Sequence, residues 1–229
     1  MSTVAFAGFP DETWAFLDGL EADNSKAYVD AHRSTYQSAI VAPSAALVDA
    51  IGPLLVERVH PDLRAESKVG RSLFRLNRDV RFSADKTPYK THLDFIFWLE
   101  GDQPRSRPAL LLRLTSDAVL VGAGRMIGRG PVLDAYRGAV ADQASGAELV
   151  GIVDALLAAG CELSEPSRAK PPLPFPADHP RAELLRRDGF HLSRTTAQPP
   201  ELSSAAFAGW CAAAYAPYRP LLDWLARLG

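Results

Sequence analysis

Three apolar segments between residues 91 and 121 constrain most strongly what this chain can fold into. Residues 91–99 and 108–115 each place apolar side chains at every second position, which is the period of a β-strand. Ser116 and Asp117 leave room only for a tight hairpin into a third strand at 118–121. Strands that follow one another without an intervening helix pair antiparallel, so the sequence predicts an α+β fold with a mostly antiparallel sheet. The alternating residues are Leu93, Phe95, Phe97, Leu99, Leu110, Leu112 and Leu114.

Helical periodicity precedes and follows these strands, so we expect N-terminal and C-terminal helices to flank the sheet. Within residues 11–59 the sequence predicts three helices that begin at Asp11, Asn24 and Pro43. Gly52-Pro53 is expected to kink or interrupt the third helix. Further helices are predicted at 131–142, 147–159, 180–187 and 201–228, short strands at 72–76 and 189–195, and an extended loop over the six prolines of 165–180.

Overall composition is that of an ordinary globular protein. The chain has 229 residues, 47% of them apolar and 23% charged, and a formal net charge of −2. The sequence contains no internal repeat and no convincing linker, so we expect a single domain over residues 1–229. The small net charge provides no global positive field that would recruit nucleic acid or an acidic membrane, so any site for an anion must be local.

Signals for targeting, metals and cofactors are missing from the sequence. Residues 1–14 lack the features of a secretory signal, and no segment approaches the ~20 apolar residues that span a bilayer, so we expect a cytoplasmic protein without a membrane partner. Cys161 and Cys211 belong to no CxxC pair or zinc-ligand spacing and are expected to be reduced core cysteines, with a disulfide as the weaker alternative. No P-loop, GxSxG or HExxH motif is present, so we expect neither a cofactor nor a metal. Oligomeric state is not indicated.

Positive charge is concentrated in one segment of this mildly acidic chain. Residues 64–92 carry eight Lys and Arg side chains against three Asp and Glu side chains, a local excess of five. Because the whole chain has a net charge of −2, the remaining residues must sum to −7. The segment 73–92, LFRLNRDVRFSADKTPYKTH, lies at the centre of this excess.

We interpret segment 73–92 as a binding site for a small anion. Arginine offers planar, bidentate donors and lysine a compact point charge, which together suit phosphate or carboxylate oxygens. In the alternative interpretation, Asp79 and Asp85 pair with the same cations and the segment is a self-paired scaffold. The excess of positive charge favours an anion site, because self-pairing cannot neutralise it. The predicted ligand-binding residues are Arg75, Arg78, Arg81, Lys86, Tyr89 and Lys90.

Two side chains in this segment, His92 and Asp79, are candidates for proton transfer if a reaction occurs there. Asp94 shares a strand face with His92. Residues i and i+2 lie ~7 Å apart along a strand, so we expect a solvent-facing polar pair rather than direct orientation of the imidazole by the carboxylate. Arg113 extends the basic surface if the strand register places it on the same face.

Residues 122–130, GAGRMIGRG, are similar in sequence to a dinucleotide-binding loop. Ile127 replaces the third glycine of GxGxxG, the preceding strand is expected to be antiparallel, and no acidic residue is placed to bind a ribose. We therefore predict a flexible turn, from which Arg125 and Arg129 can point at the same anion.

Several strings in this chain resemble one known family. FRLNRDVRFSADKTPYKTH, residues 74–92, resembles the signature of a bacterial family of conserved hypothetical proteins, the domain of unknown function numbered 2461. Three flanking strings are similar to other parts of that family, so the resemblance covers nearly the whole chain. It implies no established activity, cofactor or catalytic residue. The flanking strings are FLDGLEADNSKAYVDAHRSTY, GAGRMIGRGPVLDAYRGAV and FPADHPRAELLRRDGF.

Three classes of function remain open on the sequence. The first is a binding protein or enzyme for a small phosphorylated or carboxylated molecule, favoured by the local charge excess. The second is a structural or interaction scaffold. The third is a nucleic-acid-binding module, which needs exposed aromatic side chains, here Phe82, Tyr89 and Trp98, and which the acidic overall charge disfavours.

Overall fold

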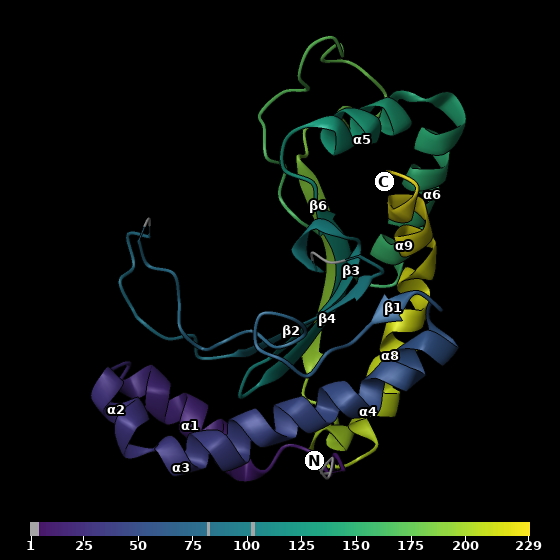
Figure 1. Cartoon of the computed structure of the whole chain (residues 1–229). Coiled ribbons are helices and arrows are strands. Elements are labelled where there is room, and N and C mark those ends of the chain that lie inside the picture. The colour runs from purple at the N-terminus through teal and green to yellow at the C-terminus, as the bar shows by residue number, and fades with distance from the viewer. Residues whose placement is uncertain (1–4, 82, 102–103) are drawn as a thin grey trace.

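A six-stranded antiparallel sheet forms the centre of the computed structural model, which describes residues 5–81, 83–101 and 104–229 (Figure 1). The strand order is β1-β2-β3-β4-β6-β5. Together with the flanking helices this confirms the predicted α+β class and the mostly antiparallel sheet. The strands are β1 (Leu63–Arg64), β2 (Leu93–Leu99), β3 (Ala109–Leu114), β4 (Ala118–Met126), β5 (Glu162–Leu163) and β6 (Gly189–Ala197).

The alternation predicted for β2 and β3 determines which face of the sheet is buried. Phe95 pairs with Leu112 and Phe97 with Leu110, and all four side chains lie in the main hydrophobic core. The predicted hairpin between β3 and β4 is confirmed, since the amide of Thr115 donates to the carbonyl of Ala118 at 3.0 Å. We call the opposite side of the sheet the open face.

Five helical segments precede the sheet, and their boundaries differ in part from the prediction. Ser25, rather than Asn24, caps α2, because the Ser25 hydroxyl accepts the amide of Tyr28 at 3.1 Å. Pro43 lies in the first turn of α4, as predicted, although α3, η1 and α4 follow one another without a break. These segments are α1 (Asp11–Ala22), α2 (Lys26–Ala31), α3 (Arg33–Thr35), the π-helical turn η1 (Tyr36–Val41) and α4 (Ala42–Arg58).

Helix α4 continues through Pro53, contrary to the expected interruption. Leu47, Ile51 and Leu55 are completely buried on one side of this helix, and that packing outweighs the hydrogen bond lost at proline. The continuous run Arg33–Arg58 is also long and apolar enough to cross a membrane by length and composition alone, so the expectation that no segment approaches that limit is wrong. A core helix of a globular protein passes the same test, and α4 packs against α8.

The remaining helices lie after β4, and several of them cover the same side of the sheet as α4 (Figure 1). The hydroxyl of Tyr215 in α8 donates to the carbonyl of Leu111 at 2.9 Å. Cys161 and Cys211 are free and buried, as predicted. The segments are α5 (Pro131–Ala141), α6 (Gln143–Ala158), α7 (Ala182–Leu185), η3 (Pro200–Ser203), α8 (Phe207–Tyr215), η4 (Ala216–Tyr218) and α9 (Arg219–Ala226), with a further short turn, η2 (Pro104–Ser106), between β2 and β3.

Residues 76–81 and 83–90 form an extended arm that projects from the edge of the sheet (Figure 1). Its two sides are joined near the root, where the amide of Arg78 donates to Pro88 and the amide of Lys90 to Leu76, both at 2.8 Å. The strand predicted at 72–76 is wrong, because only isolated bridges link this stretch to β2. The core-facing side chains Leu73 and Leu76 are three residues apart, so the stretch lacks the period of a regular strand.

Half of the predicted flexible turn at 122–130 belongs instead to β4, which extends to Met126. Gly124 lets β6 approach closely, since a β-carbon there would lie 2.2 Å from the carbonyl oxygen of Phe190. The turn itself is confined to residues 127–130, where Gly128 and Gly130 have φ angles of 72° and 97°.

Candidate functional site

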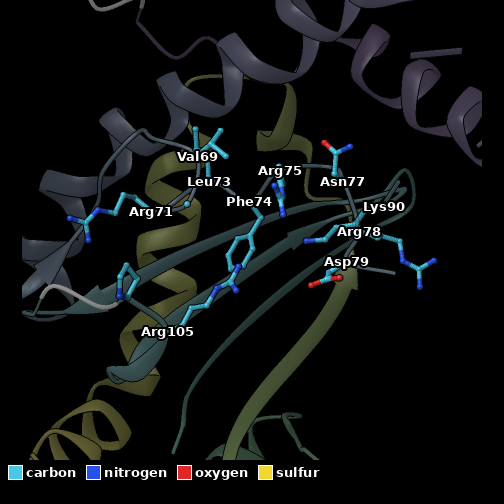
Figure 2. A pocket seen from close by; sticks show the side chains of 12 residues that line it. Val69, Arg71, Leu73, Phe74, Arg75, Asn77, Arg78, Asp79, Lys90 and Arg105 are labelled. Atoms are coloured by element: carbon cyan, nitrogen blue, oxygen red, sulfur yellow. The ribbon is translucent and has the colours of Figure 1, made fainter. Parts of the chain in front are cut away.

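The root of the arm borders a basic groove with a volume of about 800 Å³ (Figure 2). Its walls come from residues 69–79, from Lys90, where the arm returns to the sheet, and from Arg105 in η2. The chain reaches this geometry because residues 72–74 pair with β2 at the sheet edge before the arm begins. The ionisable side chains that line the basic groove are Arg71, Arg75, Arg78, Asp79, Lys90 and Arg105.

Two of these cations have no counter-ion. Within the described residues, neither Arg75 nor Arg105 forms an ion pair or a side-chain hydrogen bond. The Arg105 guanidinium lies over the ring of Phe74, with its central carbon 5.0 Å from the ring centroid (Figure 2). Arg71 differs, since its Nε lies 3.3 Å from Glu66. The groove therefore carries two cations that form no ion pair with any residue that the structure describes.

The predicted ligand-binding residues lie partly in the groove, partly at the root of the arm beside it, where Tyr89 lies, and partly in residues 80–81 and 83–87, which we call the outer arm. Arg75, Arg78 and Lys90 line the groove, while the other three do not. In the outer arm, Lys86 donates to the carbonyl of Val80 at 2.9 Å. Arg78 itself pairs with Asp85, so part of the segment is self-paired, as the alternative interpretation expected. The predicted residues outside the groove are Arg81, Lys86 and Tyr89.

Asp79 lies in the groove wall but is poorly suited to accept a proton. Arg81 donates to its carboxylate through Nε at 2.9 Å and through a terminal nitrogen at 2.7 Å. These hydrogen bonds, with a longer-range contribution from Arg75, lower the pKa of Asp79 to about 2. A carboxylate with so low a pKa is a weak base near neutral pH.

Asp94 binds both Lys90, which lines the groove, and Arg113 on the open face of the sheet. Its carboxylate accepts from Lys90 at 2.9 Å and from Nε of Arg113 at 2.7 Å, because the strand register places Asp94 opposite Arg113. Nε2 of His92 lies 3.3 Å from the same carboxylate. Burial acts to raise the pKa of Asp94, but hydrogen bonds from His92, Arg113 and Lys90 outweigh it and hold the pKa well below its ordinary value.

The direct contact between His92 and Asp94 contradicts the expected spacing of ~7 Å. His92 lies just before β2 begins, where strand geometry does not apply, and its ring turns towards the carboxylate. Its side chain remains 23% exposed, so the imidazole is oriented and still accessible.

Several residues that line the groove were not among the predicted ligand-binding residues, notably Arg71, Phe74 and Arg105. Arg105 follows β2 and lies 30 positions after Arg75 along the chain, so only the fold brings the two side chains to one groove. Arg125, which the sequence allowed to point at the same anion, is buried and donates to main-chain oxygens of Ser106, Leu225 and Gly229. Arg129 is exposed and does not line the groove.

Asn24 fixes the arm to the N-terminal helices. Its side-chain oxygen accepts the amide of Tyr89 at 2.9 Å, and its side-chain nitrogen donates to the carbonyl of Tyr89 at 3.2 Å. The residue predicted as a helix cap therefore positions the segment that leads into Lys90.

Replacing Asn24 by alanine removes both of these hydrogen bonds, and we expect local opening of the arm to become easier by about 1–2 kcal/mol. Hydrogen exchange at the amides of Arg78 and Lys90 should then be roughly 5–30 times faster. Ser25→Ala is the matched control, because it costs about 1 kcal/mol at a helix cap without touching the arm. Equal exchange rates in the two variants would refute a positioning role for Asn24.

Within the described residues, no group of three or more His, Cys, Asp and Glu side chains could hold a metal ion. A family model described as a conserved hypothetical protein family, DUF2461, matches residues 12–224. A search of the curated proteins found no match.

Proposed function

Since this chain belongs to the conserved hypothetical protein family DUF2461, whose description specifies no activity, we propose its function from the basic groove: the protein binds a small phosphorylated or carboxylated molecule there. One observation carries this proposal. Arg75 and Arg105 face a common groove without a counter-ion among the described residues. Hydrogen bonds from charged donors contribute roughly 1.5–3 kcal/mol each, so a few convergent donors are enough to hold a small anion.

The described residues that line the groove have a positive net charge, even though some of them form ion pairs. Asp79 is the one carboxylate among its described lining residues, and it is already bound by Arg81. Lys90 is shared with Asp94, but an ammonium group has three donors and can bind a second anion. Five cations and one carboxylate therefore line the same volume.

The outer arm supports a second candidate function, a structural or interaction scaffold. Two of its charged side chains pair with groove residues at the root of the arm, Asp85 with Arg78 and Arg81 with Asp79. Exposed pairs of this kind contribute only ~0–1 kcal/mol, so they shape the arm without adding much to global stability. This candidate explains the outer arm but not the uncompensated cations at its root.

Nucleic-acid binding has less support. Trp98 is only 1% exposed and cannot stack on a base, Tyr89 is half-buried and anchored by Asn24, and Phe82 lies outside the described residues. Such binding would fall steeply with salt concentration, so a mobility assay at low salt is its test.

We expect inorganic phosphate and phosphorylated or dicarboxylate metabolites to raise the melting temperature of the protein in a saturable manner. Arg75→Ala and Arg105→Ala should each weaken binding about tenfold in titration calorimetry, the loss of one charge-assisted hydrogen bond of roughly 1.5 kcal/mol. Both variants should fold normally, because no ion pair is broken. Arg58→Ala, an exposed position in α4 outside the groove, is the control.

The two candidate functions give different results in this experiment. Saturable stabilisation that needs about tenfold more ligand in Arg75→Ala and Arg105→Ala, and an unchanged concentration in Arg58→Ala, supports the anion site. If a broad panel of phosphates and carboxylates leaves the melting temperature unchanged, the proposed binding function is wrong. Stabilisation at the wild-type ligand concentration in both groove variants would place the binding site elsewhere and would equally overturn the proposal.

A further inference from the structure

A second hollow, of about 630 Å³, adjoins the basic groove on the open face of the sheet. We call it the apolar hollow. Phe74, Lys90 and Arg105 line both spaces, so the two meet at these three side chains. Volumes of 300–1,000 Å³ are typical of sites that enclose small organic ligands.

The apolar hollow exists because the centre of the open face lacks large side chains. One row across the four central strands consists of Trp98, Ala109, Gly124 and His191, and its two middle positions carry a methyl group and a hydrogen atom. The next row places Ile96 beside Leu111 and then another glycine. A trough therefore runs over β3 and β4, between the larger side chains of Trp98 on β2 and His191 on β6.

Apolar side chains form the floor and rim of this trough. Ile96 and Ala109 are buried in a small hydrophobic cluster of their own, with Phe74 and Leu111 packed against it and still partly accessible. Met126, at the end of β4, is 79% exposed at the rim. A polar ligand would not bury this surface favourably, whereas an apolar one gains from each Å² removed from water.

Positive charge surrounds the apolar floor. Lys90, Arg105, Arg107 and Arg125 line the hollow, and its described lining residues include no Asp or Glu. Arg107 lies close enough to Arg125 that its charge, after burial, contributes to lowering the pKa of the Arg125 guanidinium. Nε of Arg107 is buried with no hydrogen-bond partner among the described residues. The hollow therefore combines an apolar surface with cations that repel one another.

Phe74 contacts two cations through its ring at the junction between the two spaces. Nζ of Lys90 lies 4.9 Å from the centroid of its ring, and the guanidinium carbon of Arg105 lies 5.0 Å from it. Figure 2 shows Arg105 reaching towards the ring from η2. These cation–π contacts hold two cations at the boundary before any ligand arrives, which reduces the entropy lost on binding.

We propose that the ligand is an amphipathic anion, with a phosphate or carboxylate group held at the junction by Arg105, Lys90 and Arg75 and an apolar, flat body lying in the apolar hollow. This inference rests on the proposed anion-binding function and specifies the class of molecule that the site takes. His191 lies at the far side of the hollow, where burial and then the charges of Arg113 and Arg187 lower the pKa of its imidazole. This shift disfavours a further positive charge near the apolar body.

The test uses four probes in titration calorimetry: inorganic phosphate, 1-naphthyl phosphate, 1-naphthoate and 1-naphthol. We expect 1-naphthyl phosphate to bind at least about tenfold more tightly than inorganic phosphate, because its rings bury apolar surface. It should also bind at least about tenfold more tightly than 1-naphthol, which lacks the anionic group. The naphthoate shows whether a carboxylate can replace the phosphate.

Variants in the apolar hollow separate its contribution from that of the basic groove. Leu111→Gln should weaken 1-naphthyl phosphate about tenfold and leave inorganic phosphate unchanged. Met126→Gln is the second variant, since an exposed position at the rim does not endanger folding. Leu173→Gln is the matched control, because Leu173 is 94% exposed in the proline-rich loop and lines neither space.

Failure of this inference is distinguishable from failure of the proposed function. If inorganic phosphate binds and 1-naphthyl phosphate binds no more tightly, the amphipathic ligand is refuted and the anion site survives. If 1-naphthol binds as tightly as its phosphate, the anionic group has no part and the inference is again refuted. If none of the anions binds, both proposals fall together.

Discussion

Replacing Asp94 by asparagine is expected to lower the free energy of unfolding by about 3 kcal/mol at pH 7. Its carboxylate is 15% exposed and is shared by Lys90, His92 and Arg113, within 3.3 Å of each. An amide cannot neutralise the two permanent cations, of which Lys90 is only 21% exposed and would remain largely buried without its counter-ion, while Arg113 is 47% exposed. Urea denaturation of the wild type and the variant measures the difference.

Asp85→Asn is the matched control for this substitution. Hydrogen bonds from Thr87 and Arg78 also lower the pKa of the Asp85 carboxyl, but that side chain is 56% exposed, so solvent screens its interactions. We expect a much smaller loss of stability there. A variant at Asp94 that is as stable as the one at Asp85 would show that the network contributes little to the fold.

The stabilising effect of Asp94 should also depend on pH in a defined direction. The folded state holds its carboxyl at a lower pKa than the unfolded chain, whose value is near 3.9. The contribution is therefore complete above the unfolded pKa and is lost as the pH falls below about 4 towards the folded value. Below about pH 4, the wild type should lose stability more steeply than Asp94→Asn, and parallel profiles would contradict this.

Arg125→Met is expected to lower the free energy of unfolding by about 2–4 kcal/mol and to weaken anion binding by up to about tenfold at the same time. The buried guanidinium donates to main-chain oxygens in η2, in α9 and just beyond α9, at 2.9 Å to Ser106, 3.3 Å to Leu225 and 2.5 Å to Gly229. Methionine fills much of the space but leaves these oxygens without their donor. Because Ser106 adjoins Arg105, loss of this anchor should release the cation that lines both the groove and the apolar hollow.

Thermal unfolding and phosphate titration of Arg125→Met, compared with Arg129→Met, measure both effects. Arg129 is an exposed arginine four positions later, so the same chemical change should leave stability and binding nearly unchanged. If Arg125→Met unfolds at the same temperature as Arg129→Met, the buried guanidinium is not a structural anchor. Lost stability with intact phosphate binding would show that Arg105 is held by other contacts.

Sequence patterns predicted the parts of the fold that depend on local periodicity. Side chains such as Phe95 and Leu112 alternate because one face of the sheet is buried, so their pattern revealed the strands. Patterns failed where a tertiary contact replaced a local one. Asn24 has the chemistry of a helix cap but binds Tyr89, 65 positions away, and Pro53 stays inside a helix that packing holds together.

The candidate site was likewise predicted only where it depends on neighbouring residues in the sequence. Charge counting located the segment that borders the basic groove, and Arg75, Arg78 and Lys90 do line it. It could not assign Arg81 or Lys86 to the outer arm, because their partners depend on how the arm folds back on itself. It also missed Arg105, since η2 approaches the groove only through the pairing of β2 with β3.

The sequence by itself determined the antiparallel sheet, its buried face and the region where positive charge gathers, because these follow from the period and composition of neighbouring residues. The tertiary structure alone decided which cations stay uncompensated and what lies beside them. Arg75 and Arg105 line one groove although they are 30 positions apart, and the trough beside it needs Ala109 and Gly124 to align in one row across paired strands. Such alignment is a property of strand register, which couples residues that are distant along the chain.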